Sequence, residues 1–324
     1  MRRDCHVDDA LVNRHIGVGD GGESPMIEAL RTPDKRFDGL PGYGFAPHYR
    51  DDLPGYEGLR IHYLDEGTRG GPVFLCLHGQ PSWSYLYRKM LPVFAKAGRV
   101  IAPDLYGFGR SDKPVDDQVY TFDFHRGALL ALVEALDLQD VTLVCQDWGG
   151  LLGLTLPMEA PQRYRRLIVM NTGFATGDRP LGPGFEAWKA YNRSQPDLDI
   201  KALMQRATPI LSDAEAAAYA APYPDMRYKA GVRRFPELVP DRLLAPGAET
   251  SRRARDWWSN EWQGQSFMAV GGADPVISVE AMQGVRRHIC GCPEPMIVPE
   301  AGHFVQEWGE PIARAALAAF AAAS

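Results

Sequence analysis

Short runs of consecutive apolar residues recur along the first half of the chain, and segments with helical spacing separate them. Such runs are typical of strands buried on both faces of a sheet, whereas an earlier segment, 58–65, alternates as an antiparallel strand does. Strands that alternate with helices predict parallel βαβ units with right-handed crossovers. The predicted buried strands are 72–77, 99–103, 141–146 and 166–170, and the predicted helices are 85–96, 122–136 and 149–158.

The pattern changes after residue 172, where short helical segments follow one another without a buried strand. These segments lie at 185–191, 200–206 and 213–219. The strand signal returns at 266–271 and 295–298, and a helix over 310–322 closes the chain. We therefore expect an α/β protein whose mostly parallel central sheet is flanked by helices. Its core domain would comprise 26–172 and 248–324, with a helical cap inserted at 173–247 and a disordered polar leader at 1–25.

Composition narrows the class of protein without identifying it. The chain has 324 residues, 45% of them hydrophobic and 23% charged, with a net charge of −6. No basic stripe suggests nucleic acid as a partner, and no apolar run approaches the roughly 18 residues of a membrane span. The leader lacks the apolar segment of a secretory signal, and the five cysteines are odd in number, which favours reduced thiols in a cytoplasmic setting. Cys290 and Cys292 have no further Cys or His cluster nearby, so we expect no metal site, and we expect a monomer.

One stretch, 143–151, organises the candidate chemistry. An apolar run ends abruptly at Asp147, two glycines follow closely, and a helical segment begins. This strand, sharp turn and helix predict a nucleophile elbow, in which small neighbours let the backbone segments approach each other. A carboxylate at this position can displace a leaving group from saturated carbon and form an ester on the enzyme. The alternative is an aspartate that only caps the helix.

Two further groups follow the late strands of the predicted sheet. Asp274 comes after the strand that ends near Gly271, and His303 comes after the final strand. Nucleophile, acid and histidine in this order are typical of the α/β-hydrolase triad, in which the acid orients the histidine. The other place open to the acid holds Asn171, which cannot ionise. The alternative interpretation is that Asp274 is only a turn residue before Pro275.

Several motifs together resemble those of haloalkane dehalogenases of the α/β-hydrolase fold. They are 78–81 (His-Gly-Gln-Pro), 104–114, 146–150 (Gln-Asp-Trp-Gly-Gly), 302–304 (Gly-His-Phe) and the cap segments 185–189 and 230–236. The resemblance runs from about residue 26 to residue 320. It is closest to the group whose acid follows a late strand and whose second halide-binding tryptophan lies in the cap.

The resemblance implies a reaction and a role for each candidate residue. Asp147 would attack the halogen-bearing carbon, Trp148 and Trp188 would bind the departing halide, and His303 with Asp274 would activate the hydrolytic water. An indole N–H is a donor without an acceptor, so it favours an anion. Substrate, water and halide would be the partners, the substrate would be small and apolar, and no metal or organic cofactor would be required.

Residue 80 departs from the resembled group, which usually has an acidic residue after His-Gly. Gln80 keeps the backbone donor, which with that of Trp148 would form the oxyanion hole. Its neutral side chain would lie near the hydrolytic water and the acid, and so would alter the positioning of that water. The substrate pocket is expected to be lined by apolar residues for which core packing is the alternative: Phe185, Phe235, Pro236, Val276 and Ile277.

Three rival functions use the same fold. An epoxide hydrolase would share the triad but needs proton donors, usually two cap tyrosines, and the cap offers Tyr191, Tyr219, Tyr223 and Tyr228. A pair of tyrosines facing Asp147 would indicate the epoxide hydrolase, whereas the Trp188 indole facing Asp147 would indicate the dehalogenase. A binding protein that has lost turnover would be expected to have an incomplete triad. A carboxylesterase would need Ser at the elbow.

Overall fold

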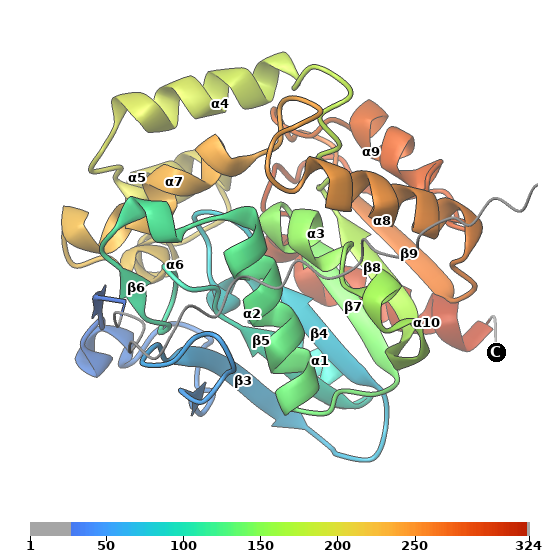
Figure 1. Ribbon diagram of the computed structural model, residues 1–324. Helices are drawn as coiled ribbons and strands as arrows, with labels where there is room; N and C mark the ends of the chain where they lie inside the picture. Colours follow the sequence, from blue (N-terminus) through green and yellow to red (C-terminus); the bar gives the residue numbers. More distant parts are fainter. Residues whose placement is uncertain (1–26, 323–324) are drawn as a thin grey trace, which may run out of the picture.

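An eight-stranded sheet forms the centre of the molecule (Figure 1). The computed structural model describes residues 27–322, so the predicted leader at 1–25, with its Cys5, lies outside the described residues. In spatial order the strands are β10 (Met296–Val298), β9 (Gln265–Gly271), β8 (Tyr164–Met170), β7 (Val141–Gln146), β4 (Val73–Leu77), β5 (Arg99–Pro103), β3 (Ile61–Gly67) and β2 (His48–Arg50).

The sheet is mostly parallel, as the alternation of strands and helices predicted. From β10 to β5 every neighbouring pair runs parallel, whereas β3 pairs antiparallel with β5 and β2 antiparallel with β3. Every residue of the central strands β4 and β7 is buried, which accounts for their continuous apolar runs. A separate antiparallel pair joins β1 (Ala29–Leu30) to β6 (Lys113–Pro114).

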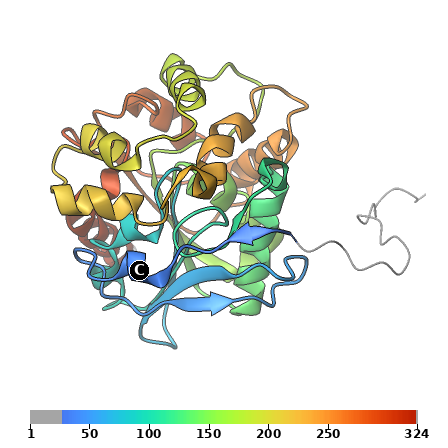
Figure 2. The ribbon, with the colours of Figure 1, turned by 90° about the vertical axis from the view of Figure 1, so that its left-hand side faces the viewer.

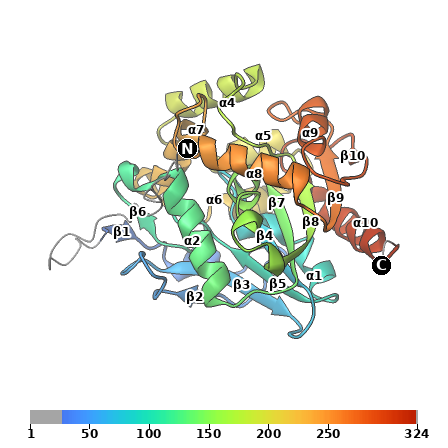
Figure 3. The same ribbon diagram turned by 45° about the vertical axis from the view of Figure 1, so that its right-hand side comes forward.

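Helices cover both faces of this sheet (Figures 1 and 3). On one face lie α2 (Phe122–Ala135), α3 (Trp148–Gly153) and α8 (Ala248–Asn260), and on the other lie α1 (Leu91–Phe94) and α10 (Gly309–Ala322). The remaining core helix, α9 (Val279–Arg286), lies between β9 and β10 in the chain and packs against β9. These layers confirm the predicted fold class of a central sheet flanked by helices.

Four helices lie over the edge of the sheet where the parallel strands have their carboxyl ends (Figures 1 and 2). They are α4 (Pro183–Ser194), α5 (Ile200–Ala207), α6 (Asp213–Ala220) and α7 (Ala230–Leu238). Helix α4 packs against α7, and α5 packs against α6. Residues 171–247, all of which are described, contribute no strand to either sheet. We refer to these four helices and their connections as the α4–α7 segment.

Two predicted helices are shorter than their patterns indicated. The segment 85–96 contains a 3₁₀ turn, Ser84–Tyr87, and the single α-helical turn α1, because Arg88 and Met90 donate to the third residue before them. Helix α3 ends at Gly153, ahead of Pro157, which has no N–H to continue a helix. None of the helices of residues 27–322 has both the length and the apolarity to cross a membrane.

Candidate active site

The elbow between β7 and α3 places Asp147 in a strained backbone conformation. Its φ of 50° and ψ of −126° are rare for a residue with a side chain, so the surroundings must enforce them. A Cβ on Gly149 would lie 2.0 Å from the carbonyl oxygen of Leu77, and one on Gly150 would lie 2.1 Å from the Thr172 hydroxyl. Both positions therefore require glycine. The close packing that they allow presents the Asp147 side chain beyond the end of the strand.

The imidazole of His303 lies between two carboxylates. Its Nδ1 is 2.8 Å from Oδ2 of Asp274, and its Nε2 is 3.4 Å from Oδ2 of Asp147. Asp274 follows β9 and His303 follows β10, so neighbouring parallel strands deliver both groups to the edge that carries Asp147. The structure thus brings together the three residues that the sequence singled out as nucleophile, acid and base.

Backbone and amide donors fix the orientation of Asp274. Its Oδ1 accepts hydrogen bonds from the N–H groups of Val276 and Ile277 at 2.8 and 3.1 Å. Its Oδ2 accepts one from Nδ2 of Asn171 at 2.8 Å, in addition to the contact with His303. The sequence alone predicts no role for Asn171, because it cannot ionise, but in the structure its amide holds Asp274 in place. Its place at the end of β8, next to β9, was the signal that could have revealed it.

The charges of this group shift two pKa values in opposite directions. Burial by itself would raise the pKa of Asp274, but the adjacent His303 and the hydrogen bonds hold that pKa below its ordinary value. Burial by itself would lower the pKa of His303, yet the carboxylates of Asp274 and Asp147 raise it well above the ordinary histidine value. With both carboxylates ionised, the imidazolium form of His303 is therefore favoured.

A backbone donor holds the other oxygen of the Asp147 carboxylate. The N–H of Gln80, in the loop after β4, donates to Oδ1 of Asp147 at 2.7 Å. A Cβ on Gly79 would lie 2.1 Å from the same oxygen, so this approach also requires glycine. Trp148 opens α3, where backbone N–H groups lack intrahelical acceptors. One backbone donor thus binds the carboxyl group of Asp147, and the N–H of the next residue has no acceptor within its own helix.

The side chain of Gln80 binds helix α7. Its Nε2 donates to the carbonyl oxygen of Val232 at 2.9 Å, and Nδ2 of Asn192 donates to the same oxygen at 3.2 Å. Pro236, four residues further along α7, has no N–H, so the Val232 carbonyl lacks its usual helical donor. The two amides replace that donor. An ionised glutamate at position 80 could not donate, so the amide found here links the loop after β4 to α7.

A cavity of about 550 Å³ separates the α4–α7 segment from the core, and we call it the catalytic cavity. Asp147, His303, Trp148 and Trp188 all line it. Neither indole N–H donates a hydrogen bond to any atom of residues 27–322, so both donors are free for a ligand. The cavity therefore combines the carboxylate of Asp147, the imidazole that pairs with Asp274, and two indole N–H groups.

The predicted pocket residues divide into three groups. Phe185, Pro236 and Val276 line the catalytic cavity, and Ile277 lines a second cavity on the other side of Asp147. Phe235 lines neither cavity. It is completely buried, its ring centroid 4.8 Å from that of Trp148, and so it supports the indole from behind. The alternative interpretation of core packing thus describes Phe235.

Other lining residues of the catalytic cavity carried no signal in the sequence. Leu203 and Arg206 are examples, and only the packing of α5 brings them there. A single apolar or basic position on a short helix cannot be distinguished from an ordinary packed or solvent-facing residue.

The four tyrosines of the α4–α7 segment do not form a pair at Asp147. Tyr219 donates to Glu307, and Tyr223 donates to the carbonyl oxygen of Pro81 at 3.2 Å. Tyr228 lines neither of the two cavities, and Tyr191 is the only one of the four that lines the catalytic cavity. Residues 27–322 contain no group of three or more His, Cys, Asp or Glu side chains that could hold a metal ion.

Comparisons with known proteins agree on one family. The profile of the alpha/beta hydrolase fold matches residues 72–310. The chain is 44% identical over 296 residues to a haloalkane dehalogenase of Psychrobacter cryohalolentis, covering 89% of this chain and 96% of the relative. It is 42% identical over 291 residues to a haloalkane dehalogenase of Mycolicibacterium paratuberculosis, covering 87% and 94%.

Solved structures agree with the sequence relatives. The tetrameric haloalkane dehalogenase DpaA from Paraglaciecola agarilytica superposes with a TM-score of 0.89 at 51% identity, covering 91% of this chain and 99% of that one. The haloalkane dehalogenase DbeA from Bradyrhizobium elkani superposes with a TM-score of 0.70 at 25% identity, covering 86% and 100%.

Proposed function

The chain belongs to the haloalkane dehalogenases of the α/β-hydrolase fold, and we propose that it hydrolyses carbon–halogen bonds through an alkyl ester on Asp147. The observation that carries this mechanism is the shared cavity. Asp147, its histidine and the two tryptophans with free indole N–H groups line the same 550 Å³ space. The proposal requires no cofactor, since the nucleophile, base and anion donors all come from the chain.

The first step is a displacement at the halogen-bearing carbon. A carboxylate oxygen of Asp147 forms a bond to carbon while the carbon–halogen bond breaks and the halide takes the electron pair. The leaving halide needs no proton, but its developing charge needs donors in a space that excludes bulk water. We assign these donors to the indole N–H groups of Trp148 and Trp188, which line the cavity from α3 and α4.

The second step removes the alkyl group from the enzyme. Ester formation neutralises the Asp147 carboxylate, one of the two charges that raise the pKa of His303. The pKa of His303 falls as a result, and its Nε2 becomes able to take a proton from water. The hydroxide attacks the carboxyl carbon of residue 147, whose oxyanion the N–H groups of Gln80 and Trp148 would stabilise. The alcohol leaves, and Asp274 stabilises the imidazolium until its proton passes to solvent.

The α4–α7 segment acts in this proposal as a cap over the core domain. It supplies Trp188 and Phe185 to the cavity, and the hydrogen bond from Gln80 to α7 holds the cap against the loop after β4. The cap–core division at 173–247, a monomeric state and a cytoplasmic location remain predictions. The substrate is a small apolar haloalkane in keeping with the aromatic and aliphatic lining.

Product analysis tests the function directly. Purified protein should release halide and alcohol in equal amounts from terminal bromoalkanes and chloroalkanes of a graded series of lengths. A terminal epoxide and a nitrophenyl ester, measured in parallel, should react far more slowly, because the site lacks a tyrosine pair and a serine nucleophile. Faster opening of the epoxide than of any haloalkane would show that the family relationship does not extend to the reaction.

A Trp188→Phe variant should weaken halide binding by about 10- to 150-fold. The substitution keeps an aromatic ring but removes one hydrogen bond to an anion, an interaction typically worth about 1.5–3 kcal/mol. Bromide titration followed by tryptophan fluorescence measures the dissociation constant, and single-turnover bromide release measures cleavage, which should slow as well. Trp257→Phe is the matched control because Trp257 lines neither cavity and packs on Trp258 and Trp262. Equal effects of the two substitutions would exclude Trp188 as a halide ligand.

A further inference from the structure

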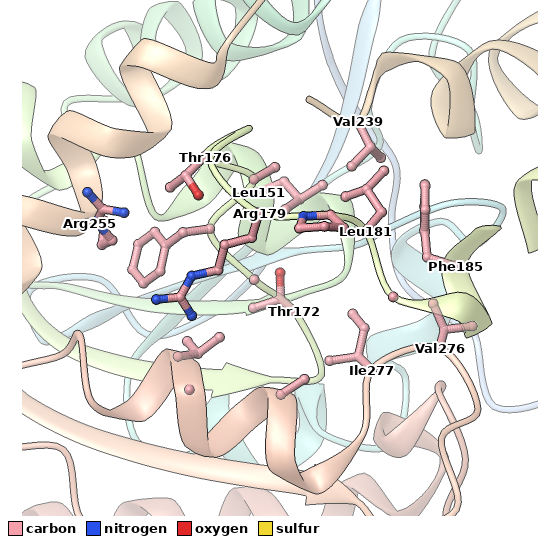
Figure 4. Close-up of a pocket in the computed structure, with 18 of the residues that line it drawn as sticks. Leu151, Thr172, Thr176, Arg179, Leu181, Phe185, Val239, Arg255, Val276 and Ile277 are labelled. Carbon is pink, nitrogen blue, oxygen red and sulfur yellow. The ribbon is translucent and has the colours of Figure 1, made fainter. Parts of the chain in front are cut away.

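A second cavity, of about 310 Å³, is shown in Figure 4, and it shares Asp147 with the first. Asp147, Phe185 and Val276 line both cavities. The connection 171–182, between β8 and α4, forms one wall of the second cavity, and residues of α8 and α9 form others. The mechanism proposed above uses only the catalytic cavity, so the second one has no role yet.

The second cavity changes in character from one side to the other. Its lining is mostly apolar near the nucleophile, where Leu151 and Ile277 contribute. Figure 4 shows Phe185 and Val276 on one side and the guanidinium groups of Arg179 and Arg255 on the opposite side. A chain that starts at Asp147 would therefore pass along apolar side chains before it reaches two cations.

The two arginines differ in how their charges are balanced. Arg255 pairs with Asp178 at 2.7 Å and with Asp256 at 3.1 Å, so acidic neighbours compensate it. Arg179 forms no hydrogen bond or ion pair with any of residues 27–322. His288, also in the lining, favours its neutral form, since burial and the nearby arginines lower its pKa. One positive charge at this end is thus left for a ligand.

The wall that carries Arg179 is itself held in place. Arg252 of α8 donates to the carbonyl oxygen of Thr176 at 2.7 Å, and Arg255 binds Asp178 in the same loop. The Thr172 hydroxyl, where the loop leaves β8, donates to the carbonyl oxygen of Asp147 at 2.7 Å. The loop that leads to Arg179 is therefore held relative to the nucleophile by contacts at three positions before it in the chain.

We propose that the second cavity holds the tail of a halogenated substrate and that Arg179 binds an anionic group, such as a carboxylate, at the end of that tail. The inference rests on the proposed dehalogenase function. The halogen would lie toward the indoles in the catalytic cavity, with the reacting carbon at Asp147 and the rest of the chain in the second cavity. Terminally halogenated carboxylates thus become a substrate class of this enzyme, and the carboxylate itself is unchanged by the reaction.

The test compares an anionic substrate with an apolar one of the same length. The values of kcat/KM for 6-bromohexanoate and 1-bromohexane are measured for the wild type, Arg179→Gln and Arg179→Lys. Arg179→Gln should lower the value for 6-bromohexanoate about threefold to fivefold, mainly through KM, as expected for an exposed ion pair. The value for 1-bromohexane should stay within about a factor of two. Arg179→Lys keeps the positive charge, so its ratio of the two kcat/KM values should stay close to that of the wild type.

Arg253→Gln is the matched control. It removes the same charge from an exposed position on α8 that lines neither cavity, so it reports any general attraction of anions to the surface. An equal drop in Arg253→Gln and Arg179→Gln, or an unchanged ratio in Arg179→Gln, would overturn the inference. An equal fall in kcat for both substrates would also overturn the inference. It would indicate instead that halide leaves through the second cavity. Absence of halide release from 1-bromohexane would instead refute the dehalogenase function itself.

Discussion

A His303→Gln variant should release one equivalent of bromide per active site and then almost stop. Cleavage of the carbon–halogen bond uses Asp147 and the halide donors and needs no base, so the first step survives. Hydrolysis of the ester needs the imidazole, whose Nε2 lies 3.4 Å from Oδ2 of Asp147, and removal of a general base typically costs about 10²–10⁴-fold. Mass spectrometry after exposure to a bromoalkane should find the protein heavier by one alkyl group, with the adduct on Asp147.

The control for this variant is His48→Gln. His48 begins β2, at the edge of the sheet that is opposite to β10, and so the substitution tests the loss of a histidine without touching the site. It should show steady turnover and no adduct. Sustained turnover by His303→Gln, or a halted enzyme without an adduct, would show that no ester on Asp147 lies on the reaction path.

The pH dependence follows from the same geometry. In the resting enzyme the two carboxylates raise the pKa of His303, whereas in the ester only Asp274 still does so. Ester hydrolysis needs the neutral imidazole, so its rate should rise with pH as His303 in the ester loses its proton. Formation of the ester needs ionised Asp147 and no proton transfer, and its rate should therefore vary less across neutral pH.

The sequence predicted the layers of this fold because buried parallel strands leave a signal that needs no tertiary context. The runs at β4, β5, β7 and β8 are apolar on both faces. No element was predicted at α8 or α9, because the buried faces of these helices are short. In α8 the buried residues are Ala248, Ser251, Ala254, Trp257 and Trp258, and small side chains make such a stripe weak.

The candidate site could be predicted only as far as strand ends determine it. Asp147, Asp274 and His303 each follow a parallel strand, and such ends converge on one edge whatever the packing elsewhere. The side chain of Gln80 could not be placed, because its acceptor on α7 exists only through the proline within that helix. The second cavity arises from the loop 171–182 and from α9, whose relative positions no local pattern in the chain encodes.

An Asp147→Asn variant should lose haloalkane turnover by about 10⁴-fold or more. An amide oxygen carries no full negative charge and is a poor nucleophile toward carbon, so no ester forms. The surrounding structure should tolerate the change, since asparagine is favoured over most residues at positive φ and its Oδ1 can still accept the Gln80 N–H. Slow deamidation would restore aspartate, visible as a gain of about one mass unit that parallels any returning activity.

Two further measurements distinguish loss of the nucleophile from loss of the fold. Bromide should bind the Asp147→Asn variant more tightly than the wild type, because a negative charge lining the same cavity as both indoles has been removed. The pKa of His303, followed by its ring protons in NMR, should fall because one of the two carboxylates that raise it is gone. Asp137→Asn makes the same substitution at an exposed residue that also has a positive φ, of 42°. It should leave turnover, bromide affinity and the pKa of His303 unchanged. An Asp147→Asn protein that binds bromide tightly yet still cleaves bromoalkanes at the wild-type rate, without deamidation, would mean that another group attacks the carbon.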